Sequence, residues 1–196
     1  ASPALFGAWA PLIHKHKNNP NTEIEVRFGR KAGHGFDTNV GKQTFEKVLG
    51  ALDRYQGWER KSKTNTTVYY FDGSKRLIVN EDTDEQVGHV KKRVLVNDFT
   101  IDEAPFDVRL GISTEEPYEY DNEEVSTEQK TRERWSFVRK NLAIDVTIVK
   151  GTPADHDVDE DTTYQVELEI VDPSKVENDV ELFNILHKIF DIMRCV

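Results

Sequence analysis

The sequence predicts an α+β protein built mainly from an antiparallel β-sheet with flanking helices. Three observations support this prediction. Apolar and polar residues alternate along a series of short segments, as side chains do along β-strands. Turn signals such as Asp72-Gly73 and Lys150-Gly151 separate some of these segments. A few other segments repeat apolar residues at the spacing of an amphipathic helix.

The elements follow from these patterns in chain order. Helical spacing marks residues 3–16, 43–55 and 180–193. Strand character marks residues 23–29, 58–63, 66–72, 76–80, 87–97, 106–114, 129–139, 143–149 and 163–171. The polar, Gly-rich stretch 31–41 is expected to be a loop. This many strands suits either a sandwich or a closed barrel.

Composition limits the class of protein. Of the 196 residues, 37% are hydrophobic and 32% charged, and because the hydrophobic ones are patterned, disorder is not expected. No apolar run is long enough to span a bilayer and no secretory leader is expected, so no membrane partner is predicted. The single Cys195 excludes a disulfide within the chain and indicates a reducing, intracellular location. We expect residues 1–196 to form a single domain of a longer protein.

Charge is unevenly distributed along the chain. The formal net charge of −10 argues against binding duplex DNA. Residues 115–128 contain seven acidic residues and residues 155–161 contain five, and neither stretch has a Lys or Arg. Both stretches are expected to be solvent-exposed loops, and the remainder of the chain is close to neutral.

Two predicted strands carry glutamates along one face. They read E-I-E-V-R-F-G from Glu23 and Y-Q-V-E-L-E-I up to Ile170. Strand alternation places Glu23 with Glu25, and Glu167 with Glu169. Hard divalent cations such as Mg²⁺ take oxygen ligands, and Glu23, Glu25 and Glu169 could supply three. The two segments therefore suggest a metal site assembled from strands distant in sequence.

The strands between these segments carry cations on one face, and one further strand carries Asp145. The cations are Arg76, Lys91 or Arg93, Arg109, Lys130, Arg132 and Arg134. The register at Lys91 and Arg93 is left open, because Lys92 falls among the valines of the opposite face. Arg and Lys both suit phosphate, Arg through its planar fork and Lys as a point charge.

Two arrangements explain these charged faces. In an open sheet, they would form cross-strand ion pairs facing solvent. In a closed barrel, they would line a polar interior, with the helices covering the apolar outside. Such an interior is costly to desolvate unless a divalent cation and a polyanion fill it. About eight strands leave room for one small ligand.

The charged faces suit hydrolysis of a metal-bound chain of phosphates. Such a reaction depends mostly on positioning and charge neutralisation, and it needs no covalent nucleophile. Other sites are poorly supported, since the sequence has no Walker loop, no Gly-x-Gly-x-x-Gly run and no histidines at zinc spacing.

The segments E-I-E-V-R-F-G, K-T-R-E-R-W-S-F and V-E-L-E resemble the triphosphate tunnel metalloenzymes. The nearest branch is the fungal and DNA-virus RNA 5′-triphosphatases of mRNA capping. Further segments of that branch, R-L-I-V, D-V-R-L-G-I-S-T-E-E-P and I-D-V-T-I-V-K, follow in its order. The acidic sequence is also similar to the N-terminal domain of capping enzymes of the mimivirus type.

This resemblance implies an eight-stranded antiparallel barrel, the triphosphate tunnel. It implies removal of the γ-phosphate from triphosphate-ended RNA, leaving a diphosphate end, with Mg²⁺ or Mn²⁺ as cofactor. It also implies a guanylyltransferase domain in the same polypeptide, although residues 1–196 contain no K-x-D-G motif. A viral origin would place the protein in the virion or the host cytoplasm.

The resemblance also assigns roles to residues. Glu23, Glu25 and Glu169 would hold the metal, Glu167 and Asp145 would orient its waters, and Glu115 would position or activate the attacking water. Arg76, Lys91 or Arg93, Arg109, Lys130, Arg132 and Arg134 would bind the triphosphate, with Arg132 and Arg134 also acting in catalysis. The sequence departs from the family pattern at Gln165, where a third acidic residue is frequent, and at Lys130, where some relatives have Arg.

Other functions remain compatible with the same residues. A tunnel of this kind could hydrolyse nucleoside triphosphates or inorganic polyphosphate, because the implied contacts are to phosphates rather than bases. It could also be a binding module that captures phosphate chains, or recruits a capping partner, without turnover.

Overall fold

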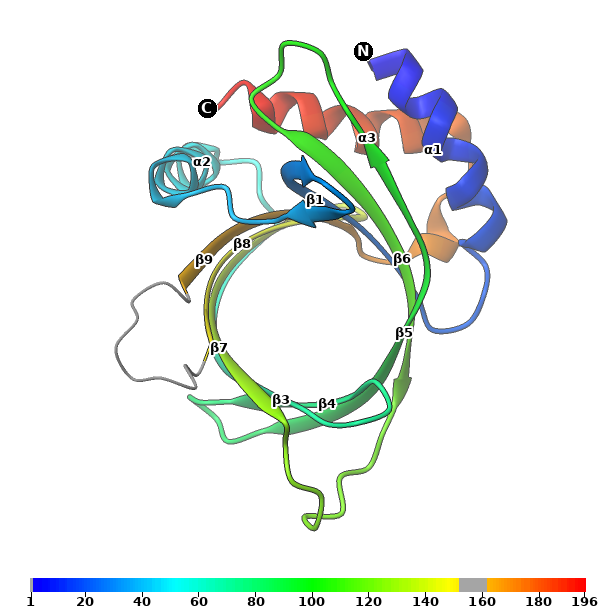
Figure 1. Cartoon of the computed structure of the whole chain (residues 1–196). Coiled ribbons are helices and arrows are strands. Elements are labelled where there is room, and N and C mark those ends of the chain that lie inside the picture. The colour runs from blue at the N-terminus through cyan, green and yellow to red at the C-terminus, as the bar shows by residue number, and fades with distance from the viewer. Residues whose placement is uncertain (1, 152–161) are drawn as a thin grey trace.

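The computed structural model describes residues 2–151 and 162–196, and its centre is a closed barrel. The strands are β1 (Thr22–Ala32), β2 (Gly35–Asp37), β3 (Arg60–Tyr70), β4 (Lys75–Asn80), β5 (Gln86–Phe99), β6 (Asp107–Pro117), β7 (Glu128–Arg139), β8 (Leu142–Gly151) and β9 (Thr162–Ile170). All pairings are antiparallel, in the order β1-β6-β5-β4-β3-β7-β8-β9, and β9 returns to pair with β1 (Figure 1). The predicted eight-stranded antiparallel barrel is confirmed, and the open sheet is excluded.

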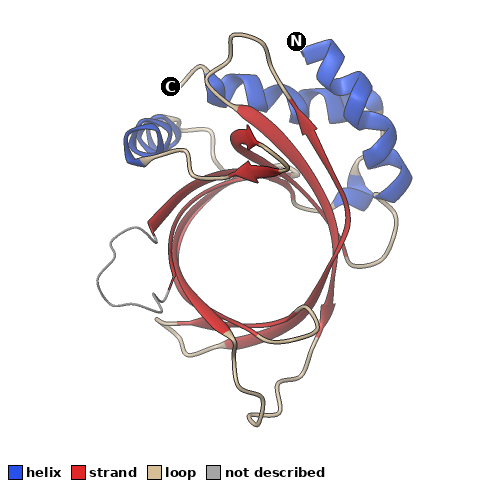
Figure 2. Ribbon diagram, in the orientation of Figure 1, coloured by secondary structure: helices blue, strands red, loops and turns tan. Residues whose placement is uncertain are grey.

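Three helices cover part of the barrel's outer surface (Figure 2). They are α1 (Ser2–His16), α2 (Lys42–Arg54) and α3 (Asp179–Met193), and a short 3₁₀ helix, η2 (Pro173–Lys175), precedes α3. The predicted helices thus lie within about two residues of the observed ones. No helix of the described residues is long and apolar enough to cross a membrane.

The hydrophobic core lies between the helices and the outer face of the barrel. Ile24, Val26 and Phe28 of β1 are almost completely buried in it, together with Trp9 of α1 and Leu186 of α3. Residues alternate along a strand, so the glutamates between these positions must point the other way, into the barrel. Helical cover on the outside therefore forces the polar face of β1 inward.

The strand β2 was not predicted, because its stretch was expected to be a loop. It pairs with the end of β1 in a short hairpin, with Arg30 opposite Asp37. Close approach of the two chains explains Gly29, where a Cβ atom would lie 2.0 Å from the carbonyl oxygen of Asp37. The strand is only three residues long, Gly35–Asp37, so it is too short to show the alternation by which a strand is recognised.

The two strands predicted at residues 58–63 and 66–72 are a single strand, β3. The residues from Lys61 to Asn65 are polar on both faces, so their hydrophobic pattern is interrupted although the backbone continues. Pairing with β7 runs unbroken from Arg60 to Tyr70. Backbone hydrogen bonding, rather than side-chain burial, holds this part of the strand in register.

The acidic stretch 115–128 is a loop only between the end of β6 and the start of β7. Glu124 in this loop accepts a hydrogen bond from Tyr118 at 2.6 Å and forms an ion pair with Lys75 at 3.1 Å. Glu115 is mostly buried rather than solvated, because it lies within β6 on the barrel's inner face. The second acidic stretch, residues 155–161, lies outside the described residues.

Candidate active site

The glutamates of β1 and β9 meet inside the barrel. The closing pairing sets Glu25 directly opposite Glu169, and Arg27 directly opposite Glu167. Directly opposed residues point to the same face of a sheet, so all four side chains enter one lumen. Lys91 of β5 reaches the same place, with its Nζ 3.4 Å from Glu23 and 3.8 Å from Glu25.

Three carboxylates of this part of the lumen have raised pKa values, and we call them the carboxylate cluster: Glu23, Glu25 and Glu169. Burial raises the pKa of Glu23 to about 7, and a hydrogen bond shared with Glu115 contributes, although Lys91 opposes it. Burial also raises the pKa of Glu169 to about 8, with repulsion from Asp145, Glu23 and Glu25 adding to it. The pKa of Glu25 moves in the same direction, again chiefly through burial.

The cluster fits a divalent cation by its chemistry. Hard cations take carboxylate oxygens, and buried carboxylates with raised pKa values gain most from an added positive charge. Among the described residues, no three carboxylate, imidazole or thiol side chains are already gathered closely enough to hold an ion. Arg27 and Lys91 instead contact the cluster, with Arg27 Nη2 3.1 Å from Glu25 Oε1.

In the neighbouring part of the lumen, cations outnumber carboxylates. We call the three cations there the guanidinium wall: Arg27, Arg132 and Arg134. Glu167 is buried beside it, and burial alone would raise its pKa, but Arg27, Arg134 and Arg132 together lower that pKa. Arg27 Nε lies 3.8 Å from Glu167 Oε1. Glu167 is therefore held as an anion by cations that the protein itself supplies.

Hydrogen bonds fix two members of the wall and one nearby acid. Arg134 donates from Nε to Thr147 at 3.0 Å, and Arg132 donates from Nη2 to the Tyr70 hydroxyl at 3.0 Å. Asp145 pairs in register with Glu167 across β8 and β9, and burial raises its pKa despite the attraction of Arg134. Both acids expected to orient water therefore lie beside the wall.

Two further predicted phosphate ligands, Arg76 and Lys130, lie against the ring of Tyr70. The Arg76 guanidinium lies 5.2 Å from the centre of its ring, and the Lys130 ammonium lies 5.6 Å from it. Lys130 also lies 3.7 Å from Glu128. The ring contacts hold two positive charges along the barrel from the guanidinium wall, and Glu128 partly compensates that of Lys130.

The structure settles the register that the sequence left open. Lys91 pairs with Glu115, and Arg93 pairs with Ser113, which itself faces Glu23. Lys91 and Arg93 thus share the inner face, and Lys92 points outward. The pairing is regular from Lys91 to Arg93, so Lys92 is simply a cation on the outer face, and a β-bulge follows Arg93. Arg93 is exposed, in contrast to the mostly buried Lys91.

Arg109 stands apart from the other predicted phosphate ligands. It donates two hydrogen bonds to Asp98, at 2.7 Å and 3.0 Å, and its guanidinium lies 5.0 Å from the centre of the Phe36 ring. A bidentate Arg–carboxylate pair already satisfies most of the donors of such a side chain. The structure does not bring Arg109 into contact with the carboxylate cluster.

Sequence reasoning missed three residues of the lumen: Arg27, Tyr70 and His89. Arg27 was placed on the right face but given no role, although its Nε is buried without a hydrogen-bond partner. His89 occurs two residues before Lys91, so alternation alone would have placed it on the inner face. Its imidazole Nδ1 contacts Glu115 Oε1. Tyr70 gave no signal, since an aromatic residue in a strand usually packs in a core.

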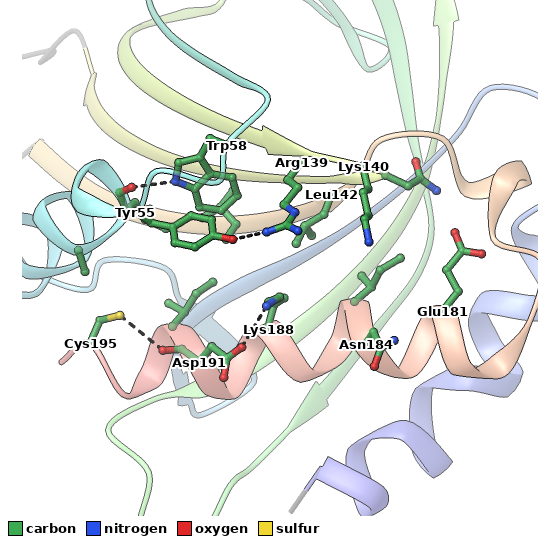
Figure 3. Close-up of a pocket in the computed structure, with 16 residues that line it drawn as sticks. Tyr55, Trp58, Arg139, Lys140, Leu142, Glu181, Asn184, Lys188, Asp191 and Cys195 are labelled. Carbon is green, nitrogen blue, oxygen red and sulfur yellow. Dashed lines mark hydrogen bonds and ion pairs between the residues drawn. The ribbon is translucent and has the colours of Figure 1, made fainter.

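A separate cavity of about 550 Å³ lies outside the barrel, between α2, α3 and the β7–β8 hairpin. Figure 3 shows Tyr55 and Trp58 toward one end of it, with Lys188 and Asp191 on α3 opposite them. None of the predicted catalytic or phosphate-binding residues lines it. The candidate active site is therefore the lumen of the barrel.

A family model and several solved structures are similar to this chain. The family described as "mRNA capping enzyme, beta chain" matches residues 57–187. A search of curated proteins found no match. The barrel is similar to that of the S. pombe Pct1 RNA triphosphatase, with a TM-score of 0.76 and 16% identity over 98% of this chain and 90% of that one.

It is also similar to the mimivirus capping enzyme triphosphatase, with a TM-score of 0.67 and 16% identity over 97% of each chain. At these identities the structural likeness establishes the fold. The family match covers more than half of the chain and includes the strand of Arg132 and Arg134 and the strand of Glu167 and Glu169. The chain therefore belongs to the mRNA capping enzyme β-chain family, and its enzyme class is the predicted one, an RNA 5′-triphosphatase.

Proposed function

We propose that this chain removes the γ-phosphate of triphosphate-ended RNA, leaving a diphosphate end, with Mg²⁺ or Mn²⁺ as cofactor. One observation carries the proposal: carboxylates whose pKa values are raised adjoin a guanidinium wall within one closed lumen. A divalent cation bound to a triphosphate complements both parts at once. Family membership supports RNA as the substrate and capping as the process.

Within this proposal the carboxylate cluster holds the cation, which would neutralise charge on the phosphates and help to align them. Arg132 and Arg134 bind the phosphate chain and stabilise the charge that develops on the leaving group. Glu167 and Asp145 orient water beside the cluster. Because the guanidinium groups are fixed by Thr147 and Tyr70, they need little rearrangement when the substrate arrives.

Arg76, Lys91 and Lys130 extend the phosphate site along the lumen, and Arg93 adds an exposed cation. Lys91 is now paired with Glu23 and Glu25, so we expect it to exchange these partners for phosphate as the cation enters. Arg109 lies on the inner face like the other predicted phosphate ligands, but it already donates hydrogen bonds to Asp98. We therefore assign it the smallest contribution to phosphate binding.

Glu115 positions or activates the attacking water in this proposal. It lies on β6 opposite Lys91, on the inner face, and it shares a hydrogen bond with Glu23. That location sets it at the edge of the carboxylate cluster. A carboxylate there can accept a proton from water that attacks the terminal phosphate.

Phosphate release with and without Mg²⁺ or Mn²⁺ tests the proposal. Triphosphate-ended RNA, ATP and inorganic tripolyphosphate should be compared at equal concentrations, and mass spectrometry should identify the new RNA end. We expect metal-dependent release of one phosphate per RNA and a diphosphate end. Faster turnover of ATP or tripolyphosphate than of RNA would favour a general phosphohydrolase. Tight triphosphate binding without release in either metal would favour a binding module.

We further propose that residues 1–196 are the N-terminal triphosphatase domain of a longer capping enzyme with a guanylyltransferase domain in the same polypeptide. The likeness to a protein described as the mimivirus capping enzyme triphosphatase supports this arrangement. Sequencing the transcript beyond the codon for Val196 tests it. A stop codon there would contradict the arrangement. A viral origin, with a virion or host-cytoplasmic location, remains a prediction from the resemblance.

A further inference from the structure

We propose that His89 is a positioning residue that holds Glu115 toward the attacking water. The inference rests on the proposed function, because it assigns His89 a purpose only if Glu115 acts on that water. Neither formation of the strand nor binding of phosphate needs a histidine at this position.

Geometry gives His89 a single strong neighbour. His89 lies on β5 and Glu115 on β6, and because Lys91 pairs with Glu115, His89 is its diagonal neighbour on the same inner face. The imidazole Nδ1 contacts Glu115 Oε1, and the two side chains are only 25% and 15% exposed. The contact therefore joins two strands at the edge of the lumen.

The protonation state of His89 follows from its surroundings. Burial lowers the pKa of His89, Arg76 on β4 and Lys91 on β5 lower it further, and only Glu23 on β1 opposes them. A neutral imidazole carries one N–H group, and contact with a carboxylate oxygen requires that group on Nδ1. In the structure His89 Nδ1 is buried, lies against Glu115 Oε1 and makes no hydrogen bond of regular geometry. Donation to Glu115 therefore requires the Nδ1–H tautomer.

Glu115 needs such a donor because its carboxylate has more than one neighbouring group with which to interact. It shares a hydrogen bond with Glu23, and the ammonium of Lys91 lies opposite it in register. A flexible carboxylate among these groups has several orientations, and small displacements of a catalytic group are costly. A donor from β5 fixes one oxygen of Glu115, so that the other can face the lumen.

Two substitutions separate positioning from packing. His89→Leu keeps bulk but removes the donor, whereas His89→Asn keeps an N–H donor close to the Nδ1 position. We expect kcat to fall about 10- to 100-fold in His89→Leu, as for other groups that orient catalytic residues, with KM for triphosphate-ended RNA little changed. His89→Asn should recover most of that loss. The matched control is His34→Leu, at the exposed turn between β1 and β2, which should change neither constant.

A double-mutant cycle tests whether His89 acts through Glu115. In a Glu115→Ala background, His89→Leu should cause no further fall in kcat, since the group it orients is gone. Additive losses would overturn the proposal, as would full kcat in His89→Leu alone.

Long-range ¹H–¹⁵N NMR of the metal-free protein reads the contact without activity. We expect His89 as the Nδ1–H tautomer in the wild type and a shift toward Nε2–H in Glu115→Ala. Nε2–H in the wild type would overturn the proposal. If the wild type hydrolyses none of the three substrates, the proposed function fails and the catalytic role of His89 fails with it. If the wild type is active but the tautomer or the cycle disagrees, only the role of His89 fails.

Discussion

Glu167 and Glu169 lie two residues apart on one strand and face the same lumen, yet their surroundings shift their pKa values in opposite directions. Burial raises the pKa of both carboxyls when taken alone. Around Glu167, the guanidinium wall more than offsets that effect and lowers the pKa. Around Glu169, Asp145, Glu23 and Glu25 add to it, and the pKa reaches about 8.

The difference shows which carboxylate the chain's own cations more than offset, Glu167, and which they do not, Glu169. A buried anion with its own cations is stable as it stands, whereas crowded carboxylates gain from a cation that comes from outside. Ligand binding at the carboxylate cluster should therefore change the protein's stability much more than any event near Glu167. Four predictions test this contrast, from the largest expected effect to the smallest.

Replacing Glu169 should have the largest effect on activity. In Glu169→Gln the carboxylate cluster loses one of its three anionic ligands, and we expect phosphate release to fall by more than about 100-fold, beyond the usual loss for an indirect contact. Steady-state phosphate release in Mg²⁺ and in Mn²⁺ measures this. Glu116→Gln is the control, since Glu116 adjoins Glu115 but is exposed on the outer face of β6. Full activity in Glu169→Gln would remove it from the metal site.

Replacing Glu167 should have its main effect on stability. Glu167→Gln leaves Arg27, Arg132 and Arg134 buried without their shared counter-charge, and breaking such a pair typically costs about 3–5 kcal/mol. Urea unfolding at pH 7 measures the change in free energy of unfolding. An unchanged midpoint would mean that solvent or other acids already compensate the guanidinium wall.

Metal-free protein should lose stability as pH rises from about 6 to about 9. The pKa of Glu169 is raised from 4.5 to about 8 and that of Glu23 to about 7, so the folded chain holds protons that the unfolded chain releases. Their stabilising effect is complete below pH 4.5 and is lost as pH rises through these values.

Thermal unfolding in EDTA between pH 6 and pH 9 measures this dependence, and Glu169→Gln should flatten it. Excess Mg²⁺ should restore the Tm at pH 9, because a ligand that binds only the folded state stabilises it. An equally steep loss of Tm in Glu169→Gln would show that other groups cause the pH dependence.

The smallest effect is expected at Arg93. This exposed cation lies on the inner face, so it should assist the approach of RNA rather than the reaction itself. We expect Arg93→Gln to raise KM for triphosphate-ended RNA by less than about tenfold at low salt, with kcat unchanged and the effect shrinking at 0.5 M salt. A fall in kcat comparable to that of Glu169→Gln would move Arg93 into the reaction centre.

Much of this site could be predicted from the sequence, because strand alternation decides which residues share a face. That rule placed Glu23 with Glu25 and Arg132 with Arg134 before any pairing was known. Alternation is interrupted after Arg93, where a bulge inserts a residue, and it is not visible along β3, where both faces are polar. In both places backbone pairing, which leaves no trace in hydrophobicity, determines the structure.

Contacts between strands were beyond the reach of the sequence. The position of Glu25 opposite Glu169, and of His89 diagonal to Glu115, depends on how each strand is staggered against the next around the barrel. The contrasting pKa values of Glu167 and Glu169 depend on that stagger too. The sequence could identify the charged groups, but the balance among them is a property of the closed barrel.

Closure of the barrel by β1 and β9 also has a kinetic consequence. The partners Glu25 and Glu169 are separated by most of the chain, and contacts of such long sequence separation form slowly because a large loop must close first. During synthesis, the guanidinium wall of β7 emerges before β9 exists. Among the strands of the barrel, β9 is synthesised last, so its arrival completes both the barrel and the carboxylate cluster.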